Sequence, residues 1–319
     1  MAMDLVLRAA GLTDVGRSRP SNEDVVLVRP DLDLYVVCDG AGGHNAGEVA
    51  SALAARSLSN YFGATIRRTH ELPEFDRFGI PGGARRLSGA ILKANKDVIE
   101  IAKSSPAHKG MGTTVVAACF SPRSGLMHVG HVGDSRCYRM RGGHLELLTQ
   151  DHSLLTDVIE QRPELDDTVL ERMPKNIVTR ALGIDPKLRV SMRSYAVVAG
   201  DRYLLCSDGL SGMLSAQAIA PLLEEKADLE AVVHNLVAAA NSAGGRDNIG
   251  AVVIECTQGP EAHSVPPPPP GVLEMVREAE SRSDPELLIL GIEELESLDR
   301  DSASDDLLHA LESLLGKRS

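Results

Sequence analysis

The stretch YVVCDG at residues 35–40 and the stretch YLLCSDG at residues 203–209 are near repeats of each other. Each begins as a short apolar run, which predicts a buried strand, and each ends in Asp-Gly. Asp is a poor strand residue, so Asp39 and Asp208 are tolerated there either as turn formers or for their ligand chemistry. Asp-Gly between apolar runs is also a strong hairpin signal. The near repetition weakens that alternative without removing it.

Further acidic residues lie where other predicted strands start or end. They are Glu23-Asp24 before residues 25–28, Asp134 after residues 128–132, and Asp247 before residues 249–254. Strand ends can lie beside one another in a sheet fold, and carboxylates brought together repel unless a cation separates them. Oxygen ligands without a His or Cys cluster select Mg²⁺, Mn²⁺ or Ca²⁺ over Zn²⁺. From the residues alone, the pattern predicts a carboxylate metal site, with hydrolysis as one use.

Residues 1–258 are predicted to form one domain of strands and helices. The strand-like runs are Val25–Val28, Leu34–Cys38, Thr114–Phe120, Leu126–Val132, Tyr203–Cys206 and Ala251–Cys256. Apolar spacing predicts helices at about Ala46–Tyr61, Arg85–Ala102 and Leu229–Asn241. Strands and helices do not alternate strictly, so a sheet sandwich covered by helices suits the pattern better than a doubly wound parallel sheet.

Composition excludes several classes of protein. The chain has a net charge of -12, 3% aromatic residues and no Trp, which argues against a nucleic-acid partner. Its five cysteines form no CxxC pair, which indicates a reducing compartment and argues against zinc. No apolar stretch approaches 18 residues, so we expect a cytoplasmic protein without a membrane partner. His128, His131 and His144 are expected on strand or turn surfaces.

The proline run Pro266–Pro270 marks a boundary, because consecutive prolines favour a stiff, extended chain. We expect a Pro-rich linker at residues 259–271 and an acidic tail at residues 272–319. Residues 271–319 contain 13 Asp/Glu and 5 Lys/Arg. Two interpretations stay open for the tail: a disordered segment with transient helices, or a docking helix with its leucines at residues 307–315.

Six segments in order resemble the motifs of the protein phosphatase 2C (PPM) family of metal-dependent Ser/Thr phosphatases, in its bacterial form. They are Gly16–Asp24, Cys38–Glu48, Gly110–Thr114, Gly130–Arg136, Leu205–Ser211 and Arg246–Asn248. Together they cover about residues 5–257; each alone is modest, whereas six in order are specific. The resemblance implies an α+β fold, an α-β-β-α sandwich of two antiparallel sheets flanked by helix pairs.

The resemblance also implies a set of metal ligands for two Mn²⁺ or Mg²⁺ ions. Asp39 would bridge the two ions. Asp208 and Asp247 would complete one site, while Glu23 and the carbonyl group of Gly40 would serve the other.

Further roles follow from the same resemblance. Asp134 matches the position that supports a third ion in bacterial members. Asp24 would orient a metal-bound water, and Arg19 would grip the substrate phosphate with its bidentate fork. Animal members carry a His directly after the Asp-Gly, as the proposed acid; Ala41 stands at that position here. His44 is the candidate acid, with a loop or helix-entry histidine as the alternative.

The implied reaction is hydrolysis of phosphoserine and phosphothreonine on proteins by a hydroxide that bridges the ions. The partners would be phosphorylated proteins, namely a Ser/Thr kinase and its substrates. One rival is a phosphoprotein-binding pseudophosphatase without turnover, against which the complete set of acidic ligands counts. The other is a metal-dependent nuclease, against which the net negative charge and the scarce aromatics count.

Overall fold

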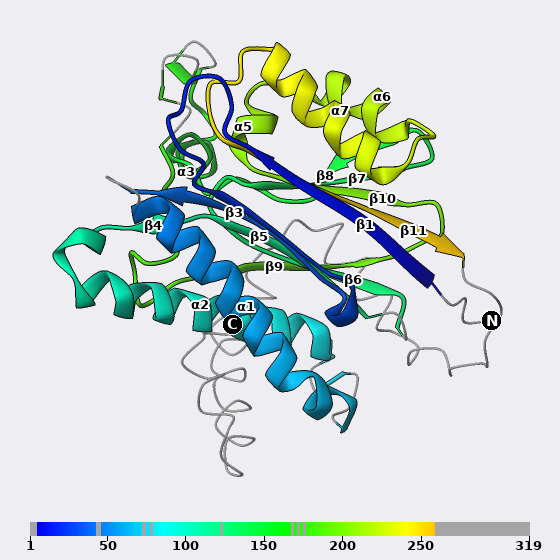
Figure 1. Cartoon of the computed structure of the whole chain (residues 1–319), viewed down its shortest axis with the longest axis horizontal. Coiled ribbons are helices and arrows are strands. Elements are labelled where there is room, and N and C mark those ends of the chain that lie inside the picture. Colours follow the sequence, from blue (N-terminus) through cyan, green and yellow to red (C-terminus); the bar gives the residue numbers. More distant parts are fainter. Residues whose placement is uncertain are drawn as a thin grey trace.

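The computed structural model describes residues 5–42, 46–71, 75–76, 79–121, 124–166, 169–170, 173–174 and 177–258. The predicted linker and tail lie outside these residues, and so does His44. The described chain forms four layers, with two sheets packed face to face and helices on both outer faces (Figure 1). The predicted α+β sandwich is confirmed.

The first sheet has the strand order β1-β11-β10-β7-β8, and all its neighbouring strands are antiparallel. Its strands are β1 (Leu5–Asp14), β7 (Arg136–Arg141), β8 (His144–Leu147), β10 (Arg202–Cys206) and β11 (Ile249–Gln258). The N-terminal strand β1 therefore pairs with β11, which lies more than 230 residues later in the chain.

The second sheet has the order β2-β3-β5-β6-β9, with the short β4 paired to the end of β3. Its strands are β2 (Asp24–Arg29), β3 (Leu34–Ala41), β4 (Gly112–Thr113), β5 (Val115–Ser121), β6 (Leu126–Val132) and β9 (Ser191–Ala196). All pairings are again antiparallel.

Two helix groups cover the outer faces of the sandwich (Figure 1). The second sheet is covered by α1 (Ala46–Glu71) and α2 (Gly82–Ser104), and the first by α5 (Asp208–Ser211), α6 (Ala216–Glu224) and α7 (Leu229–Ser242). A further helix, α3 (Leu154–Gln161), lies at one end of the sandwich. Single 3₁₀ turns occupy Pro30–Leu32 and Pro106–His108. Among the described residues, no helix combines the length and apolar character that crossing a lipid bilayer requires.

Three apolar clusters hold these layers together. One lies between α1, α2 and the second sheet, one between α5–α7 and the first sheet, and one between the two sheets. The cluster between the sheets includes Tyr35, Met127, Leu205 and Val252, all fully buried. Because both faces of the second sheet are covered, its inner strands β3 and β5 are largely apolar rather than alternating.

The predicted surface positions of His128 and His131 are wrong. Both side chains are buried, because β6 is a central strand with α2 on one side and the inter-sheet core on the other. Their polar atoms are satisfied inside: His128 lies between the hydroxyl groups of Ser121 and Ser194, at 3.1 and 2.8 Å. His144, at the start of the edge strand β8, is exposed as predicted.

Candidate active site

The acidic residues predicted to form the site lie at one end of the sandwich. Asp24 opens β2 and is the antiparallel partner of Asp39 near the end of β3. Asp208 is the first residue of α5, directly after β10, and Asp247 lies two residues before β11. Asp134 follows β6 after one glycine. Five strands from two sheets thus present a carboxylate at the same end, as the sequence pattern predicted.

Neither Asp-Gly pair forms a hairpin turn. β3 continues through Asp39 to Ala41, and Gly40 pairs with Thr113 of β4. The other pair, Asp208-Gly209, begins α5. The hairpin interpretation is therefore wrong at both positions, and the assignment of the two aspartates as metal ligands stays a prediction.

Ser207 joins the two sheets at the site. Its Oγ donates a hydrogen bond of 2.6 Å to Asp24 Oδ2 and accepts one of 2.8 Å from the backbone N–H of Gly250. Asp24 is only 4% exposed, and its second carboxylate oxygen, Oδ1, is buried with no hydrogen-bond partner in the described part of the chain. A buried oxygen without a partner is energetically unfavourable unless a proton, water or cation satisfies it.

The carboxylates raise one another's pKa values. Burial, together with the charges of Asp24, Asp208 and Asp134, raises the pKa of Asp39 well above its usual range. Burial also raises the pKa values of Asp24 and Asp208, and Asp247 adds to both effects. The pKa of Asp134 is raised to about 6, first by burial and then by Asp208. The cluster therefore favours a bound cation, which would offset this repulsion.

Glycines bring the backbone close to Glu23. A Cβ atom at Gly47, in the first turn of α1, would lie 2.5 Å from Glu23 Oε2. A Cβ atom at Gly40 would lie 2.7 Å from the carbonyl oxygen of Glu23 and would collide with that of Gly47. The Gly40 N–H donates to the Glu23 carbonyl group at 3.2 Å. Only glycine at both positions allows three segments to meet beside the Glu23 carboxylate, whose pKa burial raises.

The donor set fits a hard cation. The side chains gathered here are carboxylates, which suit Mg²⁺ or Mn²⁺. The unpartnered Asp24 Oδ1 leaves a buried acceptor for a hydrogen-bond donor such as water. As they stand, no three His, Cys, Asp or Glu side chains of the described residues form a group that could hold an ion. Asp247 gives its two oxygens to Arg19 and to a backbone N–H, and Asp24 gives one to Ser207.

Arg19 lies over the carboxylate cluster. Its Nη2 atom donates to Asp247 Oδ2 at 2.8 Å, and its side chain is 51% exposed. The bond to Asp247, and the nearby charges of Glu23 and Asp39, raise its pKa. A guanidinium group carries five N–H donors, so contact with Asp247 leaves others for an anion from solvent. The position suits the predicted contact with a phosphate.

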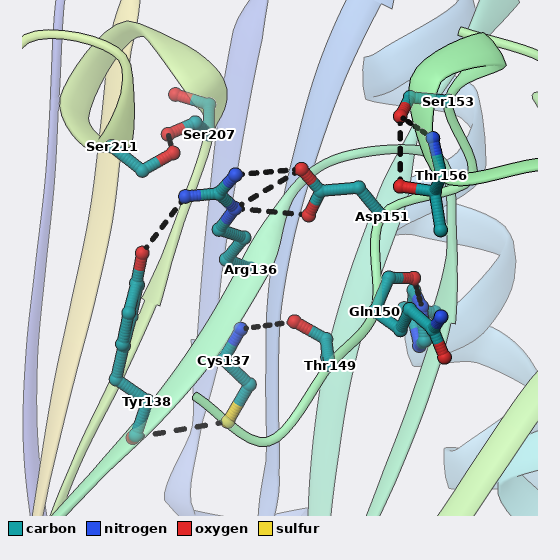
Figure 2. Close-up of polar contacts among 11 residues, drawn as sticks. Arg136, Cys137, Tyr138, Thr149, Gln150, Asp151, Ser153, Thr156, Ser207 and Ser211 are labelled. Atoms are coloured by element: carbon teal, nitrogen blue, oxygen red, sulfur yellow. Dashed lines mark hydrogen bonds and ion pairs between the residues drawn. The ribbon is translucent and has the colours of Figure 1, made fainter. Parts of the chain in front are cut away.

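Arg136, two residues after Asp134, has different partners from Arg19. Its guanidinium donates to both oxygens of Asp151, with a shortest distance of 2.7 Å, and to the hydroxyl group of Tyr138 (Figure 2). These hydrogen bonds connect β7 to the segment that follows β8. Arg136 is therefore held by Asp151 and Tyr138, although its charge still acts on Asp134 and Asp208. Arg19 is the arginine that bonds directly to Asp247.

The turn that carries Asp134 is fixed by two buried histidines. Gly133 has φ of 108°, and its N–H donates to His152 Nδ1 at 3.1 Å. The His152 ring stacks on His131 with a centroid distance of 4.7 Å, and His131 Nε2 bonds the carbonyl oxygen of Gln150. These contacts hold the turn in a conformation that favours glycine.

No acid is placed at the position after Asp39-Gly40. Ala41 is exposed at the end of β3 and has no proton to donate, so the departure from animal members stands. His44 lies outside the described residues, and its role as an acid stays a prediction.

Four residues at or behind the site had no role in the sequence analysis. Gly47, Ser207 and Asn248 belong to the quoted motifs and adjoin predicted ligands in sequence or space, so their place in a motif was a usable signal. His152 gave no signal, because its role depends on a turn 19 residues earlier.

Comparison with known proteins agrees with this geometry. The family profile described as Protein phosphatase 2C matches residues 17–247. The serine/threonine phosphatase stp of Listeria monocytogenes is 34% identical over 248 residues, which are 76% of this chain and 93% of the relative. The serine/threonine protein phosphatase PstP of Mycobacterium tuberculosis is 34% identical over 255 residues, covering 79% of this chain and 45% of that longer protein.

Solved structures show the same fold. The crystal structure of the M. tuberculosis phosphatase PstP/Ppp has a TM-score of 0.67 at 30% identity, covering 79% of this chain and 99% of that one. The PstP catalytic domain in complex with two manganese ions has a TM-score of 0.66 at 31% identity, covering 80% and 100%. The profile match, these identities and the shared sandwich together show that the chain belongs to the protein phosphatase 2C family.

Proposed function

We propose that this chain is a metal-dependent protein serine/threonine phosphatase, which hydrolyses phosphoserine and phosphothreonine on proteins. The observation that carries the proposal is the group of carboxylates at one end of the sandwich with Arg19 beside it. Relatives at 34% identity are named serine/threonine phosphatases, and they match most of this domain. An acidic cluster alone would repel a phosphate, so cations are part of the proposal.

We assign two ions, Mn²⁺ or Mg²⁺, to the cluster. Asp39 serves both ions, Asp208 and Asp247 serve one, and Glu23 with the Gly40 carbonyl serves the other. The two manganese ions in the structure of the PstP catalytic domain support this number. When bound, such ions polarise the phosphoryl group and make a water acidic enough to attack phosphorus at neutral pH.

Asp134 is assigned to a third ion. It lies close enough to Asp208 and Asp39 for their charges to affect one another. The Gly133 turn and the His152 contact keep it directed from β6 toward the same end of the sandwich as the other carboxylates.

The chain's own residues orient the reacting groups. Arg19 donates its remaining N–H groups to the oxygens of the phosphate, which offsets charge that develops in the transition state. Asp24 accepts a hydrogen bond from the attacking water through Oδ1, while Ser207 holds Oδ2. Because Asp24 is buried and Ser207 holds its Oδ2 atom, the orientation of its Oδ1 atom is fixed as well.

The substrates are phosphorylated proteins, and we infer that a Ser/Thr kinase produces them. The phosphatase domain spans residues 1–258, followed by the linker 259–271 and the tail 272–319. The tail is proposed to dock a partner or the domain itself. Deletion of residues 266–319 tests this: unchanged activity, oligomeric state and partner binding would contradict a docking role.

The central experiment measures phosphate release from a phosphothreonine peptide with Mn²⁺ and with EDTA. We expect release with Mn²⁺, none with EDTA, and none from Asp208→Asn. Asp31→Asn is the matched control, because Asp31 is exposed and, among the described residues, forms its ion pair with Arg29. Peptide binding without release would favour the pseudophosphatase, and metal-dependent cleavage of DNA or RNA would favour the nuclease.

A further inference from the structure

We propose that Asn248 is a positioning residue that holds the Arg19 loop in a fixed position relative to the carboxylate cluster. The Arg19 loop is defined here as residues 15–22, between β1 and β2. The inference rests on the proposed function for its kinetic consequences. Its structural basis is a set of contacts that one side chain and its own backbone make to four parts of the site.

The Asn248 side chain closes the Arg19 loop. Its Nδ2 atom donates to the carbonyl oxygens of Val15 and Ser21, both at 2.9 Å. These residues lie at the two ends of the loop, with Arg19 between them. A single amide group therefore draws both ends together and uses both of its N–H donors to do so.

The same side chain also holds the chain at Glu23. Asn248 Oδ1 accepts a hydrogen bond of 2.9 Å from the Glu23 N–H. Since Asn248 is only 6% exposed, these three bonds are shielded from water and their loss would leave buried polar groups without partners. The carboxamide thus connects the arginine proposed for substrate with a carboxylate proposed for metal.

The backbone of Asn248 orients two further acids. Its N–H donates to Asp247 Oδ1 at 2.9 Å, which leaves Oδ2 directed at Arg19. Its carbonyl oxygen lies against Gly209, where any Cβ would collide with it, so the residue also packs on the turn that begins with Asp208. No other side chain type offers two donors and one acceptor in this flat, compact form, apart from the longer Gln.

Asn95 provides a matched comparison. It is 3% exposed, its Nδ2 donates to the Asp185 carbonyl oxygen at 2.8 Å, and its Oδ1 accepts from the Gly183 N–H at 2.8 Å. It therefore fastens a loop to α2 by the same chemistry, and its two side-chain hydrogen bonds, to Asp185 and Gly183, involve no residue of the site. A general loss of stability would appear in variants of both asparagines.

The experiment compares Asn248→Ala with Asn95→Ala in the full chain. We expect Asn248→Ala to weaken Mn²⁺ binding to the metal-free protein, measured by calorimetry, by about 10- to 100-fold, and to raise KM for the phosphopeptide by a similar factor. Asn95→Ala should lower Tm but leave both values within about twofold of the wild type. Equal effects of the two variants, or values for Asn248→Ala within about twofold, would overturn the proposal.

A second variant separates the acceptor role of the side chain from its donor role. Asn248→Asp keeps the acceptor for the Glu23 N–H but loses both donors to the loop. We expect Mn²⁺ binding at least as tight as in the wild type, because the acceptor stays and the added charge favours a cation, while KM stays raised. Normal KM in Asn248→Asp would refute the role of the two donors.

Hydrogen exchange makes the test independent of catalysis. The Glu23 amide, and the Arg17 amide that bonds the Gly245 carbonyl oxygen at 2.6 Å, should exchange faster in Asn248→Ala but not in Asn95→Ala. If the wild type releases no phosphate, the proposed function fails, yet Mn²⁺ binding and these exchange rates still decide the role of Asn248.

Discussion

His128, His131 and His152 are each at most 6% exposed, so acidification should unfold this domain more readily than its surface charges suggest. Burial lowers the pKa of His128 to about 3, that of His131 to about 4 and that of His152 to about 2. All three stay neutral in the folded protein at pH 5, whereas the unfolded chain protonates them.

The direction of this pH effect follows from the coupling between proton binding and folding. A histidine with a depressed pKa in the folded state destabilises the fold as the pH falls below its unfolded value of about 6.5, because the unfolded chain binds the extra proton. At pH 5, about 1.5 units lower, each buried histidine removes about 2 kcal/mol of the free energy of unfolding, at about 1.36 kcal/mol per unit. Three together remove about 6 kcal/mol, comparable with the whole stability of a small domain.

The carboxylates act in the opposite direction. Asp39, Asp208 and Asp134 have raised pKa values, so the metal-free fold gains stability from them as the pH falls. The total pH dependence therefore mixes two effects. A single histidine variant separates them, because its difference from the wild type contains only the contribution of that histidine.

The assay is urea unfolding of the metal-free protein at pH 6 and pH 5, for the wild type and His128→Asn. We expect the variant's free energy of unfolding to fall less steeply, by about 1.2 kcal/mol per pH unit, even if it is less stable at pH 7. His131→Asn should behave alike if His128→Asn fails to fold. His144→Asn, at an exposed position, should keep the wild-type slope. Equal slopes for all four proteins would refute the reasoning.

Three further changes test the site. Arg19→Ala should lower kcat/KM by about 10- to 100-fold, since a hydrogen bond to a charged group contributes about 1.5–3 kcal/mol. The Mn²⁺ affinity should stay unchanged. Weaker Mn²⁺ binding by calorimetry would argue against a role of Arg19 in binding the substrate alone. Gly47→Ala should displace the Glu23 carboxylate and weaken Mn²⁺ binding about tenfold, whereas unchanged affinity would remove Glu23 from the ligands. Ser207→Ala should lower the free energy of unfolding by about 1–3 kcal/mol in urea and reduce kcat, because Asp24 loses its donor; unchanged kcat would contradict that role.

Local sequence determined several elements well. β6 spans Leu126–Val132 as predicted, and α2 and α7 begin and end within three residues of their predicted bounds. α1 is the exception, since it runs ten residues beyond the predicted Tyr61. The spacing of apolar residues predicts these elements, because a helix that buries one face, or a strand that is buried throughout, shows a recognisable apolar pattern over consecutive residues.

Other strands gave no local signal. β7 (RCYRMR) has three arginines in six residues, yet it pairs with both β10 and β8. Its arginines find carboxylates, such as Glu146 for Arg139 and Asp201 for Arg141, both at 2.6 Å. β1 is a strand through its ten-residue pairing with β11. Asp201 lies 60 residues from Arg141, and β11 lies more than 230 residues from β1, so local propensity could not reveal these partners.

The acids that gather at the site could be predicted from local pattern, since Glu23, Asp24, Asp39, Asp208 and Asp247 each adjoin a recognisable strand. The contacts that hold them could not be predicted in this way. Ser207 reaches Asp24 across 183 positions, and Asn248 reaches Glu23 across 225. Strand ends are local consequences of side-chain pattern, whereas these hydrogen bonds exist only after two sheets have packed face to face and excluded water between them.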